Sequence, residues 1–379
     1  MPQGFATAEF KARLTRAQSH MDAADLDAIL LTTEPDIRYF TGYLTRFWES
    51  PCRPWFMVLP RAGDPIAVIP SIGAALMART WISDIRTWRA PDLDDDGIGL
   101  LAETLRALGP RIGTPSGLQS HLRMPLDDFA RLNAALPQPI GADANVLRSL
   151  RLVKSEAEIE KIKTACHIAT SAFERVPEIA CVGQPLATVF RDFQRLCLDE
   201  GADWVPYLAG AAAQGGYGDV ISPADDRPLA AGDILMLDIG LVHDGYFCDF
   251  DRNFSIGSPS PNVAAGHSRL IEATYAAFEA ARPGNTAADL FHVMDKIVTG
   301  GAGGSEAGRY GHGLGMNLTE WPSIIPTDHT PLVSGMVLTL EPGIELAPGR
   351  ALVHEENIVI RENGAEWLSQ PYGAEMRRI

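Results

Sequence analysis

The feature that most constrains this fold is an apolar segment that carries an acid, ILMLDIG at residues 234–240. A turn signal, HDG, follows it and leads into YFCDFDRNF at residues 246–254. Together they predict a β-hairpin centred between residues 243 and 244, in which Asp238 and Asp249 lie opposite each other or nearly so. Two carboxylates so close on buried strands repel each other, so a proton or a cation must neutralise them. A solvated hairpin with incidental acids is the alternative, and the apolar flank makes full solvation hard.

Three later segments each place one more possible metal ligand on or beside a predicted strand. They are GHGLG with His312, LTLEPG with Glu341, and HEENIVI with Glu355 or Glu356. Each signal is weak alone, and a lone histidine in a glycine loop is more often structural. Carboxylates with one imidazole suit Mn, Fe, Co or Zn, and two adjacent ions bridged by carboxylates form a hydrolytic site.

Composition narrows the class of partner and the number of domains. The chain has 379 residues, of which 46% are hydrophobic, and its formal net charge is −16. This length predicts two domains, and the acidic balance argues against nucleic acid or anionic membrane as partner. The first residues lack the apolar core of a secretory signal, and no apolar run approaches the ~20 residues of a membrane span. The five cysteines are scattered and form no CxxC pair, so we expect a cytoplasmic protein. We expect its partner to be a small-molecule substrate.

Strand and helix signals divide the chain into two parts. Residues 1–148 alternate short apolar runs with helical patterns, which predicts a small α/β domain. Residues 149–379 open with a long helix from near Ser155 to about Val176 and continue with mostly strand signals. The second part therefore reads as α+β with a mostly antiparallel sheet, and α+β is the fold class predicted for the chain.

The ordered motifs now support a resemblance. LDIGLVHDGYFCDFDRNF, GHGLG, LTLEPG and HEENIVI resemble, in the correct order, the creatinase/prolidase/methionine aminopeptidase superfamily, whose catalytic domain has the pita-bread fold. RLVKSEAEIEKIKTACHIA is similar to the helix that opens that domain. The first ~145 residues look like the smaller, non-catalytic N-terminal domain of the creatinase and prolidase branch.

The resemblance implies two divalent metal ions, Mn, Fe, Co or Zn, held by five residues. These are Asp238, Asp249, His312, Glu341 and Glu355. In the family pattern Asp238 chelates one ion, His312 and Glu341 hold the other, and Asp249 and Glu355 bridge. Glu341 is also the expected general base for water that attacks an amide or amidine carbon. Glu355 is preferred to Glu356 because the family's last glutamate precedes two residues and then an apolar triplet, and strand alternation lets only one of the two face the site.

The sequence departs from the proline-directed peptidases of this superfamily at three positions. Those enzymes carry histidines that contact the substrate or the transition state, and the matching positions here hold Ile221, Gly308 and Thr319. The ligands are kept while the peptide-handling histidines are missing. We therefore expect hydrolysis of a small amide- or amidine-like substrate, as in the Xaa-Pro peptidase and creatinase types, with weak cleavage of Xaa-Pro dipeptides.

Two other functions stay open. The chain is also similar to metal-dependent lyases that act on dimethylsulfoniopropionate, and Glu320, eight residues after His312, is the candidate base for such a reaction on a small sulfonium or carboxylate substrate. The alternative role for Glu320 is a salt bridge. A non-catalytic binding protein of the same fold is the third possibility, against which the retention of all five ligand types counts.

Further residues are candidates for substrate binding and assembly. Tyr310, Trp321 and Arg252 are the candidate substrate-binding residues, although aromatic side chains beside glycine loops more often pack, and Arg252 can instead orient a metal carboxylate. In the N-terminal part, residues 40–55 gather Arg46, Trp48, Arg53 and Trp55. The resemblance implies a homodimer in which this segment covers the partner's site, and the alternative is a solvated loop with buried tryptophans.

Overall fold

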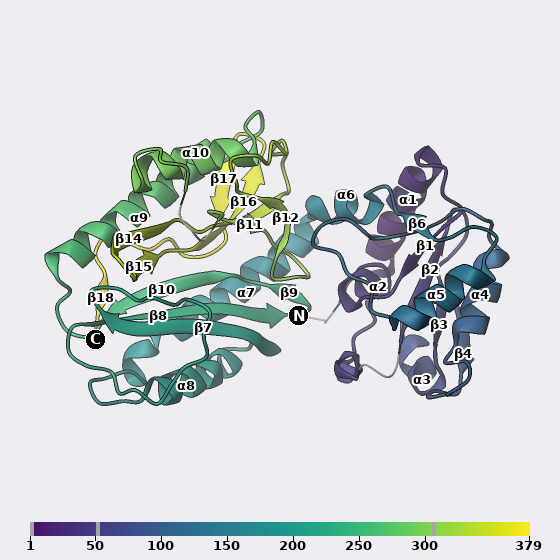
Figure 1. The fold of residues 1–379 in the computed structure, drawn as a ribbon, viewed down its shortest axis with the longest axis horizontal. Coiled ribbons are helices and arrows are strands. Elements are labelled where there is room, and N and C mark those ends of the chain that lie inside the picture. Colours follow the sequence, from purple (N-terminus) through teal and green to yellow (C-terminus); the bar gives the residue numbers. More distant parts are fainter. Residues whose placement is uncertain (1–3, 51–53, 305–307) are drawn as a thin grey trace. The chain divides into compact units, whose positions relative to one another are not determined.

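The chain divides into two compact units, residues 1–151 and residues 152–379, and each is described by itself. The computed structural model describes residues 4–50, 54–304 and 308–379 (Figure 1). Helices and strands are mixed in both units, as the predicted α+β class requires.

Unit 1 is built on one six-stranded sheet with the strand order β4-β3-β2-β1-β5-β6. The pairs β1–β2 and β2–β3 are antiparallel, whereas β3–β4, β1–β5 and β5–β6 are parallel. Leu101 and Leu105 of α4 and Leu132 of α5 share a hydrophobic core with Leu30 and Val58 of the sheet. The elements are α1 (Thr7–Ala23), β1 (Ala28–Leu31), α2 (Glu34–Thr41), the 3-10 helix η1 (Arg46–Glu49), β2 (Phe56–Pro60), β3 (Ile66–Pro70), the 3-10 helix η2 (Ser71–Gly73), α3 (Ala74–Met77), β4 (Asp84–Trp88), α4 (Ile98–Arg106), β5 (Ile112–Thr114), α5 (Leu126–Ala135), β6 (Gly141–Ala142) and α6 (Val146–Leu152).

Unit 2 opens with the long helix α7 (Glu156–Glu174), whose start is fixed by a capping box. The Ser155 side chain accepts the N–H of Glu158, and the Glu158 side chain accepts the N–H of Ser155, so two free backbone donors are satisfied at the helix end. The later helices are the 3-10 helix η3 (Val176–Glu178), α8 (Leu186–Asp199), α9 (Pro261–Ala280) and α10 (Ala287–Val298).

Two mainly antiparallel sheets form the centre of unit 2. The first has the order β18-β10-β8-β7, with β9 beside β8, and the second has the order β12-β11-β13-β16-β17. Figure 1 shows α8 on the outer side of the first sheet and α9 and α10 on the outer side of the second. The strands are β7 (Trp204–Gln214), β8 (Asp233–His243), β9 (Tyr246–Phe247), β10 (Phe250–Ser255), β11 (His312–Gly313), β12 (Glu320–Ser323), β13 (Val337–Leu340), the separate pair β14 (Gly343–Ala347) and β15 (Arg350–Val353), β16 (Glu356–Arg361), β17 (Gly364–Trp367) and β18 (Arg377–Arg378).

The β8–β10 hairpin exists, but its predicted centre was wrong by one residue. His243 pairs with Tyr246, so the turn residues are Asp244 and Gly245, both with positive φ (46° and 83°). Positive φ at both positions is what a tight hairpin turn requires. The register consequently places Asp251, and not Asp249, directly opposite Asp238. Asp249 lies two residues before Asp251, just outside β10.

Candidate metal centre

Five side chains that lie far apart in the sequence converge between the two sheets of unit 2. Asp238 lies in β8, Asp249 precedes β10, His312 lies in β11, Glu341 follows β13 and Glu355 precedes β16. Their ligand atoms form two groups that share Asp249: Asp249 with His312 and Glu341, and Asp238 with Asp249 and Glu355. Within each group, one ligand atom from every residue lies within 4.8 Å of the others. The structure therefore brings together all five residues named from the sequence.

The backbone around His312 sets the direction in which its ring acts. Nδ1 lies 2.8 Å from the carbonyl oxygen of Gly313, while Nε2 lies 2.9 Å from Glu341 Oε1 and 3.2 Å from Asp249 Oδ2. When Nδ1–H donates to the carbonyl, the lone pair of Nε2 points at the carboxylates, which is the tautomer that a metal ligand needs. Gly311, at φ 139°, lets the chain approach this closely, because a Cβ there would lie 2.2 Å from the Thr339 carbonyl oxygen.

The charges of other carboxylates, among them Asp249 and Asp251, surround Asp238 and Glu355. Tyr207 donates its hydroxyl to Asp238 Oδ2 at 2.8 Å, but Oδ1 is buried and has no hydrogen-bond partner among the described residues. Burial, and then the charge of Asp249, raise the pKa of Asp238 well above its ordinary value. Burial and the Asp238 carboxylate do the same to the pKa of Glu355. Carboxylates crowded in this way require a proton or a cation, so the residues fit a divalent metal ion.

The other group contains the imidazole, and its electrostatics differ. Burial raises the pKa of Asp249 to about 6, although His312 opposes the shift. Burial also opposes ionisation of Glu341, but the charge of His312 and its hydrogen bond lower the pKa of this carboxyl below its usual value. The Thr339 hydroxyl donates to Glu341 Oε1 as well. Despite the burial of its ring, His312 has its pKa raised to about 10, because the Glu341 and Asp249 carboxylates favour its charged form. A divalent cation would compete with that proton for the same lone pair.

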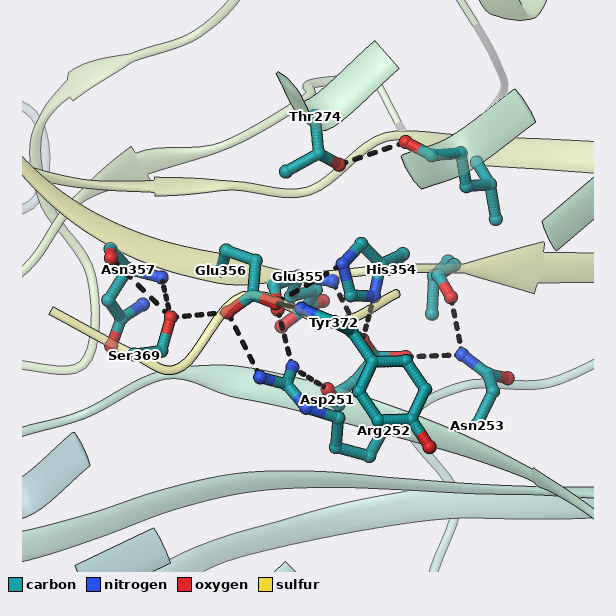
Figure 2. A network of polar contacts seen from close by, with 12 residues as sticks. Asp251, Arg252, Asn253, Thr274, His354, Glu355, Glu356, Asn357, Ser369 and Tyr372 are labelled. Carbon is teal, nitrogen blue, oxygen red and sulfur yellow. Dashed lines mark hydrogen bonds and ion pairs between the residues drawn. The ribbon is translucent and has the colours of Figure 1, made fainter. Parts of the chain in front are cut away.

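The choice between Glu355 and Glu356 follows from where each carboxylate points. Glu356 is 1% exposed, and its carboxylate accepts Arg252 Nη2 at 3.0 Å, the N–H of Tyr372 at 2.8 Å, and the Ser369 hydroxyl (Figure 2). The side chain of Glu356 is fully engaged away from the five-residue cluster. Strand alternation thus brings Glu355 to the cluster, as the sequence pattern predicted.

Glu320, the candidate base of a lyase, is buried on β12 and held by three donors. Its carboxylate accepts Lys154 Nζ at 3.1 Å, the N–H of Met316 at 3.0 Å and the N–H of Asn317 at 3.1 Å. Lys154 is 2% exposed at its side chain, so the ion pair is buried on both sides. The arrangement favours the salt bridge over the general base, because the carboxylate is paired with a buried ammonium group.

The candidate substrate-binding residues separate in the structure. Tyr310 is not brought to the cluster: its ring stacks on Phe291 at 5.0 Å within the hydrophobic core, and its hydroxyl lies 3.4 Å from Asp295. Arg252 is 3% exposed and bonded to protein groups, which places it behind the ligands and not in a pocket. Trp321 lies half-buried on β12, and its role stays a prediction.

The two tryptophans of segment 40–55 are buried within unit 1. Trp48 and Trp55 are 8% and 2% exposed and pack against each other with ring centroids 5.9 Å apart. Tyr43 joins them, 5.6 Å from Trp55. Arg46 begins η1, and Arg53 lies outside the described residues. The buried-tryptophan alternative is therefore the one that the structure supports for this pair.

Several residues that support the centre had not been identified from the sequence. Asn357 accepts the N–H of Asp249 at 3.0 Å, Tyr207 bonds to Asp238, and Asp251 accepts the N–H of Glu355 at 2.7 Å. Only Asp251 carried a signal, since it lies two residues from Asp249 and therefore on the same side of the hairpin. Asn357 lies two residues after Glu355, but it and Tyr207 come from strands other than those of the hairpin that carries Asp238 and Asp249.

Both units of the chain match known protein families. Residues 160–362 match metallopeptidase family M24, and residues 13–153 match the creatinase/prolidase N-terminal domain. The chain belongs to metallopeptidase family M24 and is a metallohydrolase of the pita-bread fold, which confirms the predicted superfamily. The family implies divalent metal ions, in agreement with the acidic and histidine groups found here. Among the described residues, no helix is long and apolar enough to cross a membrane.

Individual relatives carry dipeptidase names. The chain is 32% identical over 361 residues to the "Probable dipeptidase PepE" of Mycobacterium tuberculosis, covering 94% of this chain and 93% of that protein. It is 27% identical over 355 residues to the Xaa-Pro dipeptidase of Pyrococcus horikoshii, covering 92% and 94%. The crystal structure of dipeptidase PepE from Mycobacterium ulcerans matches with TM-score 0.85 and 31% identity over 99% of both chains. A prolidase from Thermococcus sibiricus, TM-score 0.87 at 21% identity over 99% and 100%, shows the fold alone.

Proposed function

We propose that this chain is a dinuclear metal-dependent hydrolase that cleaves the amide bond of a small substrate, with dipeptides as the first class and amidine-like compounds as the second. The observation that supports this most is the pair of ligand groups that share Asp249, with a buried and uncompensated carboxylate at Asp238. Two bound divalent ions would polarise the substrate carbonyl and lower the pKa of water. Mn, Fe, Co and Zn suit this donor set.

Each residue then has a distinct role. His312 and Glu341 would hold one ion, Asp238 the other, and Asp249 and Glu355 would serve both. The Glu341 carboxylate, oriented by the Thr339 hydroxyl and by His312, is placed to accept a proton from attacking water. The Tyr207 hydroxyl orients Asp238 through Oδ2.

The substrate preference follows from three positions without an imidazole. Ile221 is 79% exposed, Gly308 is exposed with φ 82°, and Thr319 is half-buried. None of these side chains can donate as an imidazolium does, and one missing transition-state donor typically reduces the rate by roughly 10²–10³-fold. We therefore propose that Xaa-Pro dipeptides are poor substrates, cleaved at least ~100-fold less efficiently than by a prolidase that keeps the histidines.

The lyase and the binding protein receive less support. A lyase needs a free base near the cluster, and Glu320 is engaged by Lys154 and two backbone N–H groups. A binding protein has no need for buried carboxylates such as Asp238 and Glu355 that raise each other's pKa.

Assembly and compartment are proposals of the same kind. The family resemblance suggests a homodimer, which sedimentation at micromolar concentration tests, and a monomer there contradicts it. Arg46→Ala tests whether η1 contributes to the partner's site, and unchanged kinetics would count against that cover.

Four cysteines are free, which suits a reducing compartment such as the cytoplasm; they are Cys166, Cys181, Cys197 and Cys248.

The deciding experiment joins metal analysis to a substrate panel. Protein reconstituted with Mn²⁺ or Co²⁺ should contain two ions per chain and should hydrolyse dipeptides without proline faster than Xaa-Pro dipeptides. Creatine-like amides and sulfonium acids complete the panel. Reconstituted protein that contains no metal contradicts the proposal as a whole, whereas efficient Xaa-Pro turnover contradicts only the preference.

A further inference from the structure

Glu355 lies in a gap between two strands, so no β-ladder holds its main chain. β15 ends at Val353 and β16 begins at Glu356. The two main-chain groups of Glu355 are instead bonded to the side chains of neighbouring residues on β10: its N–H to Asp251 and its carbonyl to Arg252 (Figure 2). The position of this ligand therefore depends on β10.

Asp251 is the more constrained of the two. It is 0% exposed, and its Oδ1 accepts the N–H of Glu355 at 2.7 Å. Its Oδ2 accepts Asn253 Nδ2 at 2.9 Å, and the same amide group donates to the carbonyl oxygen of Val353 at 2.7 Å. His354 Nδ1 lies 3.6 Å from Oδ1. The carboxylate thus accepts the Glu355 N–H directly and reaches the Val353 carbonyl through the Asn253 amide, which ties this stretch to β10.

Arg252 holds the same stretch from its other end. Its Nη1 donates to the Glu355 carbonyl oxygen at 3.1 Å, and its Nη2 donates to Glu356 Oε2 at 3.0 Å and to the Gln370 carbonyl oxygen at 2.7 Å. The guanidinium also lies over the rings of Phe250 and Tyr372, at 4.7 and 5.1 Å. A planar fork with several fixed partners limits rotation of the peptide group that follows Glu355.

The register of β10 connects this clamp to a second ligand. The backbone of Asp251 lies directly opposite Asp238 in the β8–β10 pair, while its side chain holds Glu355, which precedes a strand of the other sheet. One residue thus links two members of the Asp238–Asp249–Glu355 group across the two sheets.

We propose that Asp251, together with Arg252, is a positioning residue that sets the spacing between Asp238 and Glu355 and thereby the affinity of the centre for divalent ions. This inference rests on the proposed function, because it takes Glu355 to be a ligand. Groups that orient ligands in this way typically contribute about 10–100-fold in metal affinity.

The test compares Asp251→Ala with a matched carboxylate outside the centre. Asp233 is 1% exposed at the start of β8 and accepts the N–H of Ala230 at 2.9 Å and Arg227 Nη1 at 3.2 Å. Asp233→Ala therefore removes a similar buried acceptor from the same sheet. Calorimetric titration of the metal-free proteins with Mn²⁺ should show at least one ion bound about 10–100-fold more weakly by Asp251→Ala and unchanged affinity in Asp233→Ala.

Two milder variants keep the test decisive if Asp251→Ala fails to fold. Asp251→Asn retains an acceptor for Glu355 but points an amide N–H at Asn253, and Arg252→Lys loses the planar fork, so both should weaken Mn²⁺ binding less than alanine does. Wild-type affinity in every folded variant at these two positions overturns the inference and leaves the proposed function standing. Wild-type protein that binds no Mn²⁺ overturns both.

Discussion

Unit 2 contains two sets of buried carboxylates that differ in the groups around them. The first is Glu356, and the second is the Asp238–Asp249–Glu355 group. Glu356 is satisfied by Arg252, Ser369 and the N–H of Tyr372. Asp238, by contrast, has one hydroxyl donor and one oxygen without a hydrogen-bond partner among the described residues. Glu355 and Glu356 are adjacent in the sequence, yet only Glu356 has a buried cationic partner in Arg252. This difference supports the proposal that the Asp238–Asp249–Glu355 group holds a cation.

Removal of Asp249, the residue that the two ligand groups share, should have the largest effect on metal binding and on hydrolysis. Asp249→Ala takes the one residue common to both groups, so we expect loss of both ions and of detectable hydrolysis. Metal analysis after reconstitution measures the first, and turnover of a dipeptide the second. Two ions retained by this variant would contradict the assignment of Asp249 as the bridging residue.

In the metal-free protein, substitutions in the two sets should change the free energy of unfolding in opposite directions. Glu356→Gln leaves Arg252 buried without its charged partner, and breaking such a pair costs about 3–5 kcal/mol. Burial raises the pKa of Asp238 well above its ordinary value, so the metal-free protein must take up a proton there on folding. Asp238→Asn removes that requirement and should raise the free energy of unfolding in chelator. Urea unfolding with EDTA measures both. Destabilisation of similar size in both variants would remove the distinction between the sets.

Three residues of the cluster could be predicted from the sequence because each stands alone in an apolar or glycine-rich segment. Asp238 follows ILML, His312 lies between two glycines, and Glu341 precedes a Pro-Gly pair. Chain order also indicated the creatinase/prolidase/methionine aminopeptidase superfamily, whose fold then brings the segments together.

Partners that come from distant segments could not be predicted in this way. Lys154, which neutralises Glu320, lies 166 residues earlier, and no local pattern joins the two. Tyr310 is two residues from His312, yet its ring points into the core against Phe291, because Gly311 with φ 139° interrupts regular strand geometry between them. The hairpin centre was missed by one residue although the Asp244–Gly245 pair is typical of a tight turn with positive φ at both positions, which places the centre between those two residues.

A smaller effect is expected from loss of the Tyr207 hydroxyl, which donates to Asp238. Tyr207→Phe keeps the ring but removes the donor 2.8 Å from Oδ2. Loss of a group that orients a ligand typically reduces metal affinity or activity by about 10–100-fold, and we expect the lower end because the carboxylate itself remains. Mn²⁺ titration and kcat/KM on one dipeptide measure this, and values equal to wild type would show that Asp238 needs no orienting donor.

The smallest effect should come from Tyr310, whose hydroxyl lies near Asp295, a carboxylate that already has other hydrogen-bond donors. That carboxylate already accepts the N–H groups of Gly303 and Gly304 at 2.9 and 2.8 Å and the Thr299 hydroxyl at 2.5 Å, so the Tyr310 hydroxyl, at 3.4 Å, is its weakest donor. Tyr310→Phe keeps the stack on Phe291 and should lower the free energy of unfolding by no more than about 1 kcal/mol. Metal content, kcat and KM should equal those of wild type, since the ring lies in the core. A raised KM would instead return Tyr310 to the substrate site and would show that core burial does not separate the two tyrosines.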